Sequence, residues 1–443
     1  MPLVATAAGS LAVRGHLLHC LDDPFRSGAG TLRSLPDGVM IVENGHIAAI
    51  GAYAELAAAY AASPQRIHRP GMIIMPGFVD THVHAVQTDV IASPGRSLLD
   101  WLERFTFPAE QRFADGNVCD EVAAFFLHEL LRNGTTTASV FASVHPGSCD
   151  AVFAHAYALG MRINCGKVLM DRHVPDAVRD TAVEGLQQCA DLIERWHGRG
   201  RLRFSITPRF APTSSRAQLE GAAELFAMRP DLHLQSHLAE NQDEVRWVSE
   251  LYPEARSYLD VYDRFGLLGP RAIYAHGIWL DHEDRLRMAQ TGTSIAFCPT
   301  SNLFLGSGLF DLRASCDAGV AVGLGTDVGG GTSFSMLRTM AEAYKVSQLR
   351  GYTPGAGECL YLGTLGAAKA LGLDHYIGNF EIGKEADFVV CNLQATPLMA
   401  RRIALAASAE EQLFVLMTLG DDRAIAETYV SGVRRYAGAD LAA

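Results

Sequence analysis

The chain has 443 residues, of which 49% are hydrophobic and 19% are charged, and its formal net charge is -12 at pH 7. This composition is typical of a globular protein with a large core and excludes a disordered or fibrous chain. The excess of acidic residues opposes general binding to nucleic acid or to an anionic membrane surface. We therefore expect a small, neutral molecule as the partner.

The nine cysteines are scattered along the chain, and no two of them are spaced C-x-x-C. This pattern predicts reduced thiols, most of them buried. No apolar run is long enough to span a bilayer, and the N-terminus lacks the basic start and apolar block of a secretory signal. We expect a cytoplasmic protein that does not bind membranes.

Residues 1–70 are predicted to form the first part of a small β domain. Short apolar stretches surround the dipeptide Asn44-Gly45, which is a strong signal for a hairpin turn. Residues 376–443 show the same strand and turn chemistry. We expect these two ends of the chain to pair into one sheet domain.

Residues 71–375 alternate apolar β-type runs with helix-like stretches, which predicts a parallel sheet wrapped by helices. Eight runs are present, the number that closes a (β/α)8 barrel. They cover residues 72–79, 135–141, 161–169, 202–207, 232–236, 272–275, 294–298 and 320–324. The predicted fold class is α/β, a (β/α)8 TIM-like barrel with a small β-sandwich domain formed by the N- and C-terminal segments.

The first predicted barrel strand leads into His82 and His84, two positions apart on an extended backbone. Side chains at i and i+2 lie on one face of a strand, so both imidazoles can reach a single metal ion. Two unrelated polar histidines are the alternative interpretation. The position of the pair just after a buried strand, where barrel enzymes build their active sites, favours metal binding.

Further histidine and aspartate residues follow other strands. The fifth run contains His233 and ends near His237, the sixth ends at His276 and the eighth at Asp327. Either histidine of the fifth run would, alone, more often be a core or surface residue than a ligand. Together, however, four strand ends deliver His or Asp to one rim of the barrel. Three histidines with one carboxylate suit zinc or iron and exclude an oxygen-only calcium or magnesium site.

Two other classes of zinc enzyme are excluded by their motifs. Cytidine-deaminase-type enzymes carry H-x-E with P-C-x-x-C, and many metalloproteases carry H-E-x-x-H on a helix. The chain contains neither pattern.

The motifs together resemble the amidohydrolase superfamily, through PGFVDTHVH, the histidine after strand five, the His-Gly after strand six and the LGTD after strand eight. Within it, nine stretches look like the guanine deaminase family. These are HVHAVQ, FTFPAEQRF, NGTTTA, GKVLMD, TPRFAP, SHLAENQDEV, CPTSNLFLGSG, GLGTDVGGG and LGDDR. The resemblance runs from about residue 10 to the end of the chain.

This resemblance implies the hydrolytic deamination of guanine to xanthine and ammonia in purine degradation or salvage, by a zinc-activated water. It implies one zinc ion per chain, with ferrous iron as the alternative, and a homodimer. The implied metal ligands are His82, His84, His237 and Asp327. The implied catalytic residues are Glu240, His276 and Asp327. The implied contacts to the purine base come from His84, Gln87, Arg209, Phe210, His237 and Glu240.

The chemistry of these side chains supports such roles. Glu240 follows His237 by three residues and can face the same cavity, where a carboxyl group of raised pKa can act in turn as base and acid. The alternative is a solvated charge within the acidic stretch 240–244. Arg209 supplies fixed charged donors, and the Gln87 amide both donates and accepts. Phe210 either stacks on the ring or simply packs.

Lys167 raises the question of metal count, because some relatives carry a carboxylated lysine that bridges two metals. Its setting in GKVLMD matches the deaminase pattern, which favours one metal.

Two other functions stay open from the sequence. One is deamination of a related ring, such as 8-oxoguanine, a thiomethyl-adenosine type nucleoside or an aminotriazine. The other is a non-catalytic, dihydropyrimidinase-like scaffold.

Overall fold

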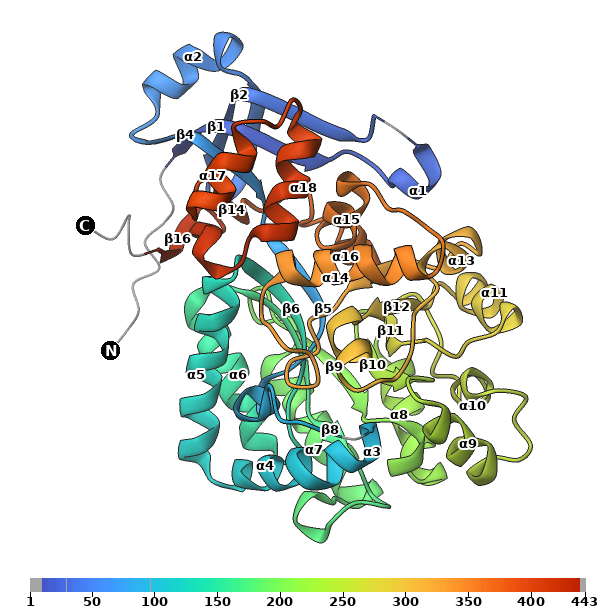
Figure 1. The fold of residues 1–443 in the computed structure, drawn as a ribbon. Coiled ribbons are helices and arrows are strands. Elements are labelled where there is room, and N and C mark those ends of the chain that lie inside the picture. The colour runs from blue at the N-terminus through green and yellow to red at the C-terminus, as the bar shows by residue number, and fades with distance from the viewer. Residues whose placement is uncertain (1–9, 29, 96, 439–443) are drawn as a thin grey trace.

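Two sheets organise the chain in the computed structural model, which describes residues 10–28, 30–95 and 97–438. A parallel barrel occupies the middle of the chain, and a mixed sheet built from both ends of the chain packs beside it (Figure 1). The predicted α/β class and the pairing of the two ends are both confirmed.

The barrel has eight main parallel strands, each hydrogen-bonded to its neighbour. In order they are β5 (Phe78–His84), β6 (Thr135–Phe141), β7 (Arg162–Gly166), β9 (Arg203–Pro208), β10 (His233–Leu238), β11 (Ala272–His276), β12 (Ser294–Phe297) and β13 (Val322–Leu324). The short β8 (Val168–Leu169) also pairs with β9. The chain after β13 returns to β5, where the Asp327 amide donates to the His82 carbonyl at 2.9 Å and the His84 amide to the Val328 carbonyl at 2.9 Å. These bonds close the ring.

The start of the barrel differs from the prediction. The run 72–79 was expected to be one barrel strand, but it is divided between β4 (Gln65–Pro76), which belongs to the mixed sheet, and β5. The change of sheet takes place at Gly77, where an added Cβ would lie 2.3 Å from the Thr136 hydroxyl. Because residues on both sides of Gly77 are buried and apolar, hydrophobicity alone gives no break.

The expected small sandwich takes the form of one seven-stranded sheet in the order β16-β15-β14-β4-β1-β2-β3. Its other strands are β1 (Leu11–Cys20), β2 (Leu32–Glu43), β3 (His46–Ala52), β14 (Phe388–Asn392), β15 (Ile425–Val430) and β16 (Val433–Ala437). The two ends of the chain meet where β14 pairs antiparallel with β4. The predicted hairpin is confirmed, since Asn44 and Gly45 join β2 to β3 with φ values of 50° and 79°, as a two-residue turn of this kind requires.

Helices surround the barrel (Figure 1). They are α5 (Gly116–Arg132), α6 (Pro146–Leu159), α7 (Ala182–Trp196), α8 (Arg216–Met228), α9 (Gln242–Leu251), α10 (Tyr258–Arg264), α11 (His282–Thr291), α12 (Pro299–Phe304), α13 (Leu312–Asp317), α14 (Met336–Leu349), α15 (Ala356–Leu362) and α16 (Leu365–Ala370). Helix α7 shows why they form: Thr181 caps it, and the buried Cys189, Leu192 and Ile193 fall on one face. That face packs on the barrel.

Shorter elements complete the fold. Helices α1 (Pro24–Ser27), α2 (Tyr53–Ala62), α17 (Pro397–Ile403) and α18 (Ala409–Leu419) accompany the mixed sheet. A series of short helices follows β5, namely η1 (Ala85–Val90), α3 (Leu98–Trp101), η2 (Leu102–Thr106), α4 (Phe107–Gln111) and η3 (Arg112–Ala114). Single turns lie at η4 (Asp176–Val178), η5 (Ala211–Thr213) and η6 (Asp422–Ala424).

The cysteines and the helices agree with two expectations from the sequence. All nine cysteines lie in the described part of the chain as free thiols, and eight of them are buried. Among the described helices, none combines the length and the apolar character needed to cross a bilayer.

Candidate active site

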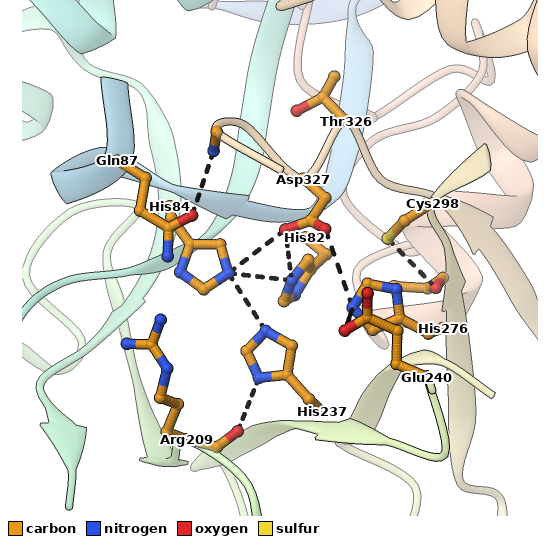
Figure 2. Close-up of polar contacts among 12 residues, drawn as sticks. His82, His84, Gln87, Arg209, His237, Glu240, His276, Cys298, Thr326 and Asp327 are labelled. Atoms are coloured by element: carbon orange, nitrogen blue, oxygen red, sulfur yellow. Dashed lines mark hydrogen bonds and ion pairs between the residues drawn. The ribbon is translucent and has the colours of Figure 1, made fainter. Parts of the chain in front are cut away.

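Four side chains from three places around the barrel converge at the carboxyl ends of the strands. His82 and His84 lie on β5, His237 lies on β10, and Asp327 follows β13. The Nε2 of His84 lies 3.2 Å from Nε2 of both other histidines. Asp327 Oδ1 lies 3.1 Å from His82 Nε2 and 3.4 Å from His84 Nε2. Figure 2 shows these donor atoms directed toward one point.

The protonation states of this group suit a cation. Burial lowers the pKa of His84 to about 3 and that of His237 well below its usual value, so both rings are neutral. Burial alone would raise the pKa of Asp327, but the neighbouring histidines hold it well below its usual range. His237 donates from Nδ1 to the carbonyl of Arg209 at 2.7 Å, which leaves the Nε2 lone pair free to face the group.

The donor set fits a divalent metal ion. A tetrahedral site with ligand distances of about 2.0–2.1 Å separates its ligand atoms by roughly 3.3 Å, and the observed separations of 3.1–3.4 Å bracket that value. Three imidazole nitrogens and one carboxylate oxygen favour a borderline metal over calcium or magnesium. The four residues therefore form a metal-binding group.

Asp80 fixes the backbone on which two of these residues lie. Its carboxylate is buried and accepts hydrogen bonds from the Thr326 hydroxyl at 2.5 Å, the Thr326 amide at 3.0 Å and the His82 amide at 3.2 Å. Asp80 thus ties the end of β5 to the segment that carries Asp327. Burial raises its pKa to about 6.

Glu240 and His276 lie beside the metal-binding group. Glu240 Oε2 is 3.3 Å from His276 Nε2, and Glu240 Oε1 accepts a hydrogen bond from the Ser307 hydroxyl at 2.9 Å. Burial and the charge of Asp327 raise the pKa of Glu240 to about 8, so this carboxyl group holds a proton at neutral pH. A protonated carboxyl group at this position can donate to a bound molecule and then accept a proton again.

Three of the residues that aim these groups adopt left-handed backbone conformations. The φ angles are 49° at Ala239, 74° at His276 and 50° at Asp327. Such conformations cost about 1–3 kcal/mol each in a residue with a side chain and persist where the surroundings determine them. Their concentration here indicates that stability is given up to direct Glu240, His276 and Asp327 into one cavity.

A cavity lies beside the metal-binding group. Every residue expected from the sequence to contact substrate or metal lines it, with the exception of His82. Its lining comprises His84, Gln87, Leu98, Trp101, Leu102, Arg209, Phe210, His237, Glu240, Glu244, His276, Leu305, Asp327 and Gly330. The helical segment after β5 therefore supplies its apolar cover.

A polar arrangement occupies one wall of the cavity. Arg209 Nη1 donates to both carboxylate oxygens of Glu110, at 2.8 and 3.0 Å. Gln87 Nε2 lies 3.4 Å from Glu110 Oε1, and Gln87 Oε1 accepts from the Gly329 amide at 3.3 Å. Phe210 is buried and meets Trp247 edge-on, with 6.2 Å between ring centroids. The wall thus presents amide and guanidinium groups whose orientation is fixed by neighbours.

Comparison with known proteins gives the family. The model of the amidohydrolase family matches residues 73–435. Guanine deaminase from Escherichia coli K12 is 48% identical over 424 residues, which cover 95% of this chain and 96% of that protein. The solved structure of the E. coli enzyme has a TM-score of 0.94 and covers 96% of this chain and 99% of its own. The chain belongs to the guanine deaminases of the amidohydrolase family.

Another solved guanine deaminase, from C. acetobutylicum, holds guanine in its active site. It is 28% identical to this chain, with a TM-score of 0.87, and covers 97% of this chain and 100% of its own.

Lys167 and His233, which the sequence offered as candidate metal ligands, lie outside the metal-binding group of this guanine deaminase. The buried Lys167 forms an ion pair with Asp180 at 2.6 Å. Its ammonium group is thereby neutralised by a carboxylate from the loop between η4 and α7. His233 lies at the start of β10 and its Nε2 bonds the Leu371 carbonyl at 2.9 Å. Of the two histidines on β10, His237 is the one that lies in the metal-binding group.

Several residues of the site were not singled out from the sequence. They are Asp80, Glu110, Glu244, Asn302 and Ser307. Asp80 stands in PGFVDTHVH, which resembles the amidohydrolase superfamily, and the other four stand in stretches that resemble the guanine deaminases, such as FTFPAEQRF for Glu110 and CPTSNLFLGSG for Asn302 and Ser307. Their polar side chains are all buried, and a buried polar group needs a partner. No spacing or motif in the sequence indicates which partner each of them binds.

Proposed function

We propose that this chain deaminates guanine, releasing xanthine and ammonia. The observation that carries the proposal is the buried Glu240 carboxyl group beside a His3Asp metal-binding group, in a cavity that Arg209 and Gln87 line. The E. coli relative at 48% identity and the guanine-bound C. acetobutylicum structure support guanine as the substrate.

The proposed cofactor is one zinc ion per chain, held by His82, His84, His237 and Asp327. When bound, such an ion makes water acidic enough to act as a nucleophile near neutral pH. The choice of zinc over ferrous iron rests on the near-tetrahedral spacing of three imidazoles and one carboxylate.

In the proposed reaction a bond forms between the water oxygen and guanine C2, and the bond from C2 to the exocyclic nitrogen breaks. Glu240 donates its proton to ring nitrogen N3, which removes the cost of building negative charge on the ring. It then takes one proton from the attacking water and passes it to the departing amine, and the remaining proton on the water oxygen returns to Glu240 as the C2 carbonyl forms. The raised pKa of Glu240, about 8, suits a group that must both give and receive a proton at neutral pH.

His276 and Asp327 take the remaining proposed roles. His276 donates from Nδ1 to Asn302 Oδ1 at 2.9 Å, which leaves Nε2 as an acceptor directed toward Glu240 Oε2 and Asp327 Oδ2, at 3.3 and 3.8 Å. The two residues can therefore orient the attacking water and share its proton. Ser307 keeps Glu240 in reach through the bond to Oε1.

Recognition of the base is proposed to come from the polar wall. Arg209 and Gln87 donate to the carbonyl oxygen and ring nitrogens of the base, while Phe210 and the apolar cover enclose the ring. A site that pairs hydrogen bonds with the substrate discriminates strongly against rings that lack those groups.

The test is turnover by the purified protein. Guanine should give equimolar xanthine and ammonia, followed by the change in ultraviolet absorbance. Turnover of 8-oxoguanine, adenosine and an aminotriazine should be much slower, and a higher rate on any of them would replace guanine as the substrate. An absence of xanthine would refute the proposal.

Two further measurements bear on cofactor and assembly. A non-catalytic scaffold should purify without stoichiometric metal, whereas we expect about one zinc per chain from metal analysis. The homodimer implied by the family resemblance is also proposed here, and light scattering of the purified protein tests it.

A further inference from the structure

We propose that Glu110 is a positioning and specificity-determining residue, which holds Arg209 in place for the purine and cancels its charge so that the cavity selects a neutral base over an anionic one. This inference rests on the proposed function, because it takes Arg209 as a group that reads the substrate.

The first observation is the charge inventory of the cavity. Among the described residues that line it, Arg209 is the one with a permanent positive charge. Its side chain is 3% exposed, and the Glu110 side chain is 0% exposed. An isolated guanidinium so deeply buried would attract any anion small enough to enter. With Glu110 bound at 2.8 and 3.0 Å, the pair is neutral as a whole.

The second observation is the geometry of the contact. Both bonds to Glu110 start from a single nitrogen, Nη1 of Arg209. Within the described residues, Nε and Nη2 of Arg209 have no hydrogen-bond partner, and Figure 2 shows the guanidinium on the side of the site where Gln87 and His84 lie. Glu110 therefore fixes the plane of the guanidinium and leaves two donor atoms for a ligand.

The third observation is that Glu110 also contacts Gln87, the second polar side chain proposed to recognise the base. Its Oε1 lies 3.4 Å from Gln87 Nε2, while the Gly329 amide bonds Gln87 Oε1 at 3.3 Å. The orientation of the Gln87 amide is thus set at both ends. One buried carboxylate joins two side chains from different parts of the barrel rim, Gln87 in η1 after β5 and Arg209 directly after β9.

Arg209 also connects this wall to the metal-binding group. Its carbonyl oxygen accepts the Nδ1 proton of His237 at 2.7 Å. A guanidinium drawn out of place by an anion would therefore pull on the backbone that orients a metal ligand. Neutralising the guanidinium with Glu110 protects both functions of this residue.

The test compares two purines as inhibitors at one mildly alkaline pH. Xanthine, the product, carries a negative charge there after losing a ring proton, whereas hypoxanthine is neutral. We expect Glu110→Gln to lower the ratio of the xanthine to the hypoxanthine inhibition constant by about 10-fold or more, because the Arg209 charge is then uncompensated. Its kcat/KM for guanine should fall by about 10- to 100-fold. Glu110→Asp keeps the charge and should keep the ratio.

A matched control is Glu427→Gln. Glu427 is also 0% exposed and binds an arginine, Arg69, at 2.7 and 2.9 Å, but it lies on β15 of the mixed sheet. It should lower stability without changing the ratio. Equal weakening of both inhibitors in Glu110→Gln would assign Glu110 a purely structural role and overturn the proposal.

If Glu110→Gln does not fold, the reverse comparison replaces it. In Arg209→Gln the negative charge of Glu110 has no cationic partner, so the ratio of the xanthine to the hypoxanthine inhibition constant should rise. The double variant that also carries Glu110→Gln should bring this ratio back toward the wild-type value. No such return would overturn the proposal. A wild-type protein inactive on guanine would instead refute the proposed function, while an active one with an unchanged ratio in these variants refutes the role of Glu110 alone.

Discussion

Asn302 Oδ1 accepts the Nδ1 proton of His276 at 2.9 Å, and this bond fixes the tautomer of the histidine. The amide nitrogen of Asn302 is buried without a hydrogen-bond partner in the described structure. A buried, half-satisfied amide is costly, and the hydrogen bond between its oxygen and His276 offsets part of that cost. The bond leaves His276 Nε2 unprotonated, where it faces Glu240 and Asp327.

Asn302→Ala should therefore lower kcat by about 10- to 100-fold, a typical effect of losing the partner that orients a functional histidine. Metal content should stay at the wild-type level, because none of the four metal-binding residues contacts this amide. Asn302→Asp still accepts the Nδ1 proton and should retain more activity than the alanine variant. Wild-type kcat in Asn302→Ala would show that the tautomer of His276 is immaterial.

Glu240→Gln should keep the metal and lose most turnover. Glutamine can still accept the Ser307 hydrogen bond, so the local structure is preserved, but it cannot donate and regain a proton. We expect kcat to fall by about 100- to 10,000-fold, the usual contribution of general acid–base catalysis. Ser307→Ala, which leaves the carboxyl group but frees it to rotate, should cost much less. A Glu240→Gln variant with nearly full activity would remove Glu240 from the proton transfers.

The metal-binding residues could be predicted because they obey local rules. His82 and His84 alternate on one strand, and the remaining ligands follow strand ends that a parallel barrel gathers at one rim. Glu110 obeys no such rule. It binds Arg209, which is 99 residues away, and no spacing within a single sequence predicts that a buried carboxylate on a short helix meets a guanidinium at the end of another strand.

The start of the barrel shows the same limit in the fold. Residues on both sides of Gly77 are apolar and buried, because β4 lies inside the mixed sheet and β5 inside the barrel. The spacing of apolar residues in a sequence indicates which residues are buried. Burial is the same on both sides of Gly77, although the strands that pair with the chain are different. The crossing at Gly77 depends on close contact with Thr136, which only the folded arrangement creates.

Metal binding can be tested with two histidines of the same strand. His237→Ala should lose the metal and turnover, since its Nε2 faces the group. His233→Ala should keep both, because its Nε2 bonds the Leu371 carbonyl. In the wild type, removal of the metal by a chelator should lower the free energy of unfolding, by about 4 kcal/mol if the ion was present at a thousand times its dissociation constant. Added zinc should restore stability and activity. If His233→Ala lost the metal and His237→Ala kept it, His237 would not be the ligand.

Glu244 should make stability depend on pH. Its carboxylate is buried and accepts hydrogen bonds from the amides of Glu240 and Asn241, at 2.9 and 3.1 Å. Burial raises the pKa of Glu244 from 4.5 to about 7. A raised carboxyl pKa means that the folded state keeps the proton longer than the unfolded state. The stabilising contribution is thus fully present below about pH 4.5 and is lost as the pH rises to and through about 7.

Glu244→Gln cannot ionise, yet its amide oxygen can still accept both backbone hydrogen bonds. The variant should therefore gain stability relative to wild type between about pH 4.5 and 7, by on the order of 2–3 kcal/mol, and the difference should level off above that range. Urea unfolding of the metal-loaded proteins across this range measures it. Glu250→Gln, which removes an exposed carboxylate from the same helix α9, should give no comparable change. The contrary outcome is a free energy of unfolding that depends on pH in the same way in wild type and in Glu244→Gln. It would show that Glu244 is already ionised in the folded protein at acidic pH.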